Sequence, residues 1–145
     1  MRRFSTLIFL ALLIFATSAW AADWRPIPER RDFEVKNPEA LLERTYQILK
    51  DWAEEAGPEP FDVERARKSA SHILSLHVKE YDAEAVLVLI EDREVGEPDA
   101  YEFMLYEAPA MEPVSWGAVL ITKPFDEWLK PILEEGFDPE FQDGL

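Results

Sequence analysis

A crowded run of acidic residues is the most suggestive local feature of the sequence. Five carboxylates fall within nine residues: Glu91, Asp92, Glu94, Glu97 and Asp99. Carboxylates this close repel one another, which raises their pKa values and favours a bound cation. The spacing lacks the alternating ligands and fixed glycine of a calcium-binding loop. We therefore interpret the run as a solvated acidic loop open to a cation or a basic partner, and assign no metal ligand and no cofactor.

The tryptophans differ in their sequence surroundings. Trp52 and Trp128 fall on apolar helical stripes, whereas Trp24 lies in a proline-containing arm and Trp116 near the start of an apolar strand. A core position is the default interpretation, but an exposed tryptophan beside acidic residues suits a protein or sugar ligand. The predicted binding site joins this tryptophan to the acidic loop: Asp92, Glu94, Glu97, Asp99 and Trp116.

Residues typical of catalytic centres are scarce or badly spaced. His72 and His77 are five residues apart, which separates them by about 140° on a helix and places them on opposite faces of a strand. Neither arrangement brings both rings to one metal ion. No serine lies in a Gly-x-Ser-x-Gly context, and the chain has no cysteine. We assign no catalytic residue, although carboxylates that converge only in the folded chain would allow a hydrolase.

The strongest helix signal begins at residue 38. Asn37 is a good N-cap, Pro38 suits the first helical position, and Gly57 followed by proline ends the pattern. Apolar side chains recur at helical spacing and predict a face packed on the core: Leu41, Leu42, Ile48, Leu49, Trp52, Ala53 and Ala56.

The next segment supports two interpretations. Asp62 is suited to cap a helix starting at Val63, and apolar residues keep helical spacing as far as Tyr81. Leu74, Leu76 and Val78 also alternate with polar residues, which is a strand pattern. Because a strand would need two junctions without glycine or proline, we expect helix over residues 72–80 and keep the strand as the alternative.

Three strands and a last helix complete the expected fold. The strands cover about residues 84–91, 101–107 and 114–122, with connections short enough for an antiparallel meander. A helix opens near Pro124, and Pro131 inside its apolar stripe predicts a kink before the end at Gly136. The expected class is α+β, with two N-terminal helices, a small antiparallel sheet of three to four strands and a kinked C-terminal helix.

The first residues predict export. Arg2 and Arg3 precede the apolar run Leu7–Ala16, and Ala19-Trp20-Ala21 resembles a cleavage site. The run is too short for a retained membrane anchor, which needs about 20 apolar residues. We expect a cleaved Sec-type signal peptide over residues 1–21, an extended arm over 22–36 and one domain over 37–145.

Charge narrows the possible partners. The chain has 15 basic and 30 acidic residues, and loss of the two leader arginines lowers the net charge from −15 to −17. Such a surface repels nucleic acid and anionic lipid and favours basic partners. We therefore expect an exported acidic binding or accessory protein, non-catalytic, located in the bacterial periplasm or secreted. It would engage a basic protein or a cation; the alternative is the hydrolase described above.

Overall fold

The computed structural model describes residues 27–92 and 99–140. The predicted signal peptide 1–21 and the loop residues Glu94 and Glu97 lie outside these ranges. The described chain folds into helices packed on a four-stranded antiparallel sheet, which confirms the α+β class. None of its helices is long and apolar enough to cross a bilayer.

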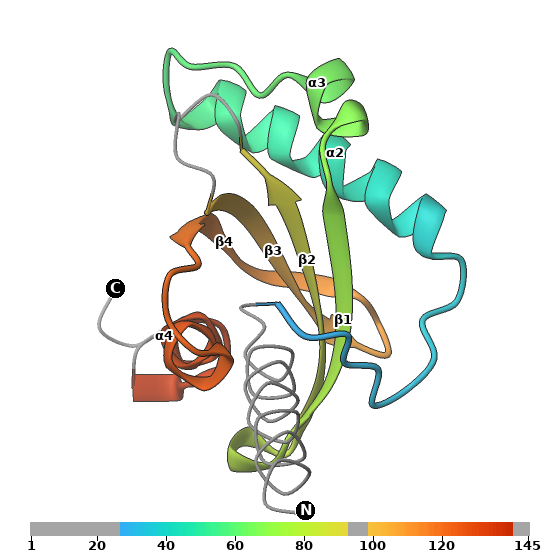
Figure 1. Ribbon diagram of the computed structural model, residues 1–145, viewed down its shortest axis with the longest axis vertical. Helices are drawn as coiled ribbons and strands as arrows, with labels where there is room; N and C mark the ends of the chain where they lie inside the picture. Colours follow the sequence, from blue (N-terminus) through green and yellow to red (C-terminus); the bar gives the residue numbers. More distant parts are fainter. Residues whose placement is uncertain (1–26, 93–98, 141–145) are drawn as a thin grey trace, which may run out of the picture.

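The sheet is a simple meander. Its strands are β1 (Ser71–Val78), β2 (Ala83–Glu91), β3 (Ala100–Ala108) and β4 (Glu112–Leu120), arranged in chain order. Each neighbouring pair is antiparallel, and a register shift between Leu105 and Tyr106 interrupts the β3–β4 pairing. Figure 1 shows the strands side by side, with α2 near one end of the sheet and α4 at the lower left. The three strands predicted over residues 84–122 are all present.

Helix α2 (Pro38–Ala56) forms where its end signals place it. The Asn37 side chain accepts a hydrogen bond from the Ala40 N–H at 3.2 Å, and the Gly57 N–H donates to the Ala53 carbonyl at 3.2 Å. The helix buries Leu41 and Leu49 as expected. It also buries Thr45 and Tyr46, which the apolar pattern did not include.

The helix expected over residues 72–80 is wrong. Helix α3 (Val63–Lys68) is capped by Asp62 as predicted but ends after six residues, and the chain then enters β1. Pairing with β2 decides the outcome, because it places Leu74, Leu76 and Val78 in the core. The turn from β1 to β2 needs no glycine: a 3₁₀ turn ends at Asp82, whose φ of 48° is one that a short polar side chain tolerates.

The C-terminal helix, α4 (Phe125–Phe137), runs through Pro131 as one element. Its buried side includes Trp128, Leu129 and Ile132. Gly136 does not end the helix but lies on this buried side, where an added Cβ would stand 2.8 Å from Leu105 Cδ2. The absence of a side chain at Gly136 therefore lets the helix approach the sheet closely.

Strand alternation divides the core into two layers. On β3, Phe103 and Leu105 join the cluster that contains the apolar residues of α4. Met104 and Tyr106 join the cluster that contains those of α2. Because successive strand residues point to opposite faces, Glu102 shares the α2 face with Met104. The molecule thus has an α2 layer, a sheet and an α4 layer.

The described part of the arm lies along β1. Arg31 forms a single parallel bridge with Ser75, and the Asp32 N–H donates to the Ser75 carbonyl at 2.9 Å. The Ser75 hydroxyl donates to the Phe33 carbonyl at 2.5 Å. The pairing of the arm with the sheet is therefore a single bridge at Arg31, which covers part of the outer edge of β1.

Candidate functional site

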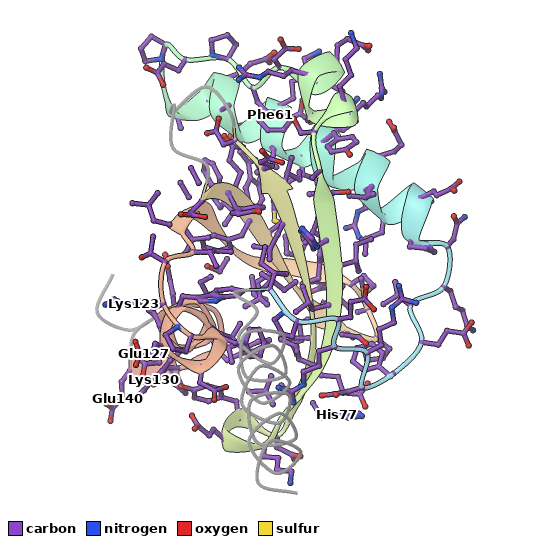
Figure 2. The ribbon with its side chains drawn as sticks, viewed as in Figure 1. Phe61, His77, Lys123, Glu127, Lys130 and Glu140 are labelled. Atoms are coloured by element: carbon purple, nitrogen blue, oxygen red, sulfur yellow. The ribbon has the colours of Figure 1, made fainter. Side chains whose placement is uncertain are left out.

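A broad, open hollow lies on the α2 side of the sheet, at the end where β2 stops and β3 starts. It has a volume of about 840 Å³ and lies between the last turns of α2, the loop that leads to α3, and the sheet. We call it the acidic groove, because its walls carry four carboxylates and two aromatic rings: Glu59, Asp62, Asp92, Glu102, Phe61 and Trp116. Figure 2 labels Phe61 at the end of the molecule where α2 and α3 lie.

The floor of the groove contains an unusual carboxyl group. Glu102 pairs with Ile90 of β2 and Ala118 of β4, so it lies on an inner strand, near the end of the sheet where β3 starts. Burial removes water from the charged form and raises its pKa from 4.5 to about 7, and the nearby charge of Asp92 adds to the increase. Near neutral pH, Glu102 is therefore divided between its neutral and ionised forms.

The structure brings two of the predicted binding residues together. Asp92 directly follows β2, where its N–H donates to the Ala100 carbonyl at 2.9 Å, and it lines the acidic groove. Trp116 lines the same groove from β4. Asp99 is exposed and is not among the groove residues; its carbonyl accepts a hydrogen bond from the Ile121 N–H at 2.8 Å.

Trp116 belongs to the surface rather than to the core. It lies within β4 and not at its start, and 40% of its area is exposed. Its ring centroid is 5.5 Å from that of Trp52 on α2, at an interplanar angle of 55°. Contact with Trp52 fixes one side of the indole and leaves the other side available to a ligand.

Sequence reasoning missed part of the groove. Glu102 was not singled out, although a charged residue between Tyr101 and Phe103 in an apolar strand was a usable signal. Asp62 was recognised only as a helix cap, a role the structure confirms through its hydrogen bond from the Arg65 N–H at 3.2 Å. Phe61 and Glu59 lie in a loop with no periodic pattern, so only the fold places them at the groove.

The histidines take no part in this site. As expected for a strand, His72 and His77 lie on opposite faces of β1. His72 lies edge-on to Tyr101, and burial lowers its pKa. His77 Nδ1 is 3.3 Å from Glu84 Oε1, and Figure 2 shows His77 toward the opposite end of the molecule from Phe61. Residues 27–92 and 99–140 hold no group of three or more side chains suited to bind a metal ion.

Comparisons of the chain with protein-family models, curated proteins and solved structures found no match. What the site can do must therefore be argued from its own chemistry. Carboxylates beside an exposed indole form an environment for a cation, because carboxylates accept charge-assisted hydrogen bonds and the indole face attracts positive charge.

Proposed function

We propose that this chain is an exported, non-catalytic acidic binding protein whose acidic groove receives a basic side chain of a partner protein. The observation that carries the proposal is the convergence of Asp92, Glu102 and Trp116 on one groove. A lysine or arginine side chain matches all three, with its charged head near the carboxylates and its stem along the indole.

The state of Glu102 links this binding to pH. A cation in the groove stabilises the ionised carboxylate and so lowers its pKa from about 7 toward the usual range. Binding then releases a proton whenever Glu102 begins protonated. Affinity for a basic ligand should therefore increase as the pH rises through about 7.

Export to the bacterial periplasm or beyond belongs to the same proposal. It is supported by the basic start, the short apolar run and the small residues before position 22. A net charge of −17 after loss of the two leader arginines would keep such a protein soluble and guide basic partners to it.

Titration calorimetry with a lysine- and arginine-rich peptide tests the binding claim. We expect binding that weakens with added salt. Asp92→Asn and Glu102→Gln should each weaken it about tenfold, equal to about 1.4 kcal/mol. Asp51→Asn, an exposed change on α2, is the matched control. Equal peptide affinity in the wild type and in all three variants would rule out the acidic groove as the binding site. Peptide binding that does not change with salt concentration would rule it out as well.

A second function is favoured by one observation. A carboxyl group with a pKa of about 7 beside another carboxylate is also suited to general acid–base catalysis, as in a hydrolase. Assays of the protein on soluble polysaccharides and their chromogenic fragments separate the two functions. Turnover that Glu102→Gln abolishes would favour the hydrolase, whereas loss of peptide affinity without any turnover would favour the binding protein.

A further inference from the structure

The two edges of the sheet differ in their protection. The arm covers part of β1 through the bridge between Arg31 and Ser75. At the other edge, no segment within residues 27–92 or 99–140 pairs with the outer side of β4. In Figure 1, β4 is the last strand of the sheet.

The hydrogen-bond register shows which groups face outward. The Ile121 N–H donates to the Asp99 carbonyl at 2.8 Å, and the same register pairs Val119 with Tyr101 and Gly117 with Phe103. In an antiparallel pair, residues alternate between bonding the neighbouring strand and pointing away from it. The N–H and carbonyl groups of the intervening residues therefore point out of the sheet: Trp116, Ala118 and Leu120.

The side chains on this edge do not protect it. Edge strands are usually kept from pairing by charged residues, inserted prolines or bulges. Beyond the register shift at Val114, the stretch of β4 from Ser115 to Leu120 contains no charge and no proline. Trp116 and Leu120 are 40% and 50% exposed and are the large apolar side chains that the described surface displays most openly. This stretch can therefore accept another strand.

We propose that an extended basic segment of a partner protein adds to β4 as a fifth strand. The inference rests on the proposed function and specifies the form of its ligand. An added strand lies about 5 Å from β4, so its side chains on the α2 face pass beside Trp116, which belongs to both the edge and the acidic groove. Charge complementarity favours a basic segment, whereas a second copy of the mature chain, with its own net charge of −17, would be repelled.

Amide hydrogen exchange on the full mature protein tests the proposal, with an alternating lysine–valine peptide as probe. We expect the amides of Trp116, Ala118 and Leu120 to exchange freely alone and to exchange at least about tenfold more slowly with the peptide. Two outcomes would contradict the proposal that a peptide strand adds to β4. One is a bound peptide that leaves these amides unprotected, which leaves the groove proposal standing. The other is protection already present without peptide, because the edge would then be occupied.

A pair of variants isolates the backbone contribution. Ala118→Pro removes an N–H that points away from β3, a position where an edge strand tolerates proline. Ala118→Val keeps that N–H and serves as the matched control. We expect about tenfold weaker peptide binding for the proline variant alone, with unchanged circular dichroism showing that it folds. Equal affinity of the two variants would contradict strand addition, and failure of every basic peptide to bind would remove both proposals.

Discussion

Glu102 combines the conflicting demands of the site in one residue. Its position on β3 partly buries the side chain between Ile90 and Ala118. The ionised carboxyl group, however, is stable only where water or a cation contacts it. The raised pKa of about 7 records this conflict, because the folded chain holds the proton more tightly than the unfolded chain does. The free energy of unfolding should therefore depend on whether Glu102 is protonated.

The pH dependence of stability follows from this shift. An unfolded glutamate has a pKa near 4.3, so the folded chain binds more protons between about pH 4.5 and 7. Stability contributed by neutral Glu102 is present below this window and is lost as the pH rises through it. The full shift corresponds to at most about 3.5 kcal/mol; because the side chain is partly solvated, we expect about 1–2 kcal/mol.

Glu102→Gln should remove that dependence. Above about pH 7 the variant should be more stable than the wild type by the same amount of about 1–2 kcal/mol, and below about pH 4.5 it should gain nothing. Urea unfolding across this pH range measures the difference. Glu107→Gln, an exposed change on the same strand, is the control. Parallel curves for the wild type and Glu102→Gln would contradict the prediction.

A second residue-scale interaction ties α2 to the sheet. The Thr45 hydroxyl donates its proton to the Leu41 carbonyl at 2.7 Å and accepts a hydrogen bond from the Tyr106 hydroxyl at 2.7 Å, with both side chains buried. Tyr106→Phe should reduce the free energy of unfolding by about 1–1.5 kcal/mol. A double-mutant cycle with Thr45→Val should give a coupling of about 1 kcal/mol. Additive losses in urea unfolding would show that the hydroxyl pair contributes nothing.

At the scale of elements, the helices and strands that could be predicted from the sequence are those with strong local signals at their ends. Helix α2 has a cap, an N-terminal proline and a terminal glycine, so Asn37 and Gly57 defined it in advance. Residues 71–78 have both helical and strand periodicity. They form a strand because they pair with β2, and a local sequence pattern does not reveal such pairing. Glu102 was missed for a similar reason, because its burial depends on elements distant in sequence.

Helix α4 offers a test of backbone strain at an exposed position. Pro131 has no N–H to donate to the carbonyl one turn earlier, yet the helix continues through it. Its side chain is exposed, so Pro131→Ala should leave packing intact and raise the free energy of unfolding by about 1–3 kcal/mol. Glu135→Ala, also exposed on α4, is the control. Loss of stability in Pro131→Ala would show that the proline is needed for the docking of this helix.

At the scale of the whole molecule, the fold assembles a site from segments that the sequence keeps apart. Glu102 on β3, Trp116 on β4 and Asp92, directly after β2, meet where the loop after α2 crosses the sheet end. Composition and the acidic run predicted a basic partner or a cation and singled out Asp92, whereas the sequence surroundings of the tryptophans singled out Trp116. The groove itself depends on sheet order and on the position of α2, which only the folded chain defines.

The proposed export can be checked on the intact protein. Expressed with its own N-terminus in a Gram-negative host, the chain should be recovered from the periplasm without its first 21 or 22 residues. Intact-mass spectrometry measures this directly. An Ala19→Leu and Ala21→Leu variant should accumulate the uncleaved form. Full-length protein found only in the cytosol would contradict export.

The central claim is that a basic ligand occupies the acidic groove, and an NMR titration of the indole N–H signals tests it most directly. With a lysine- and arginine-rich peptide, Trp116 should shift progressively and saturate, because its ring lines the groove. Trp128, buried with α4 on the other side of the sheet, should remain unchanged. Saturable binding that leaves Trp116 unmoved, or shifts Trp128 equally, would contradict the account.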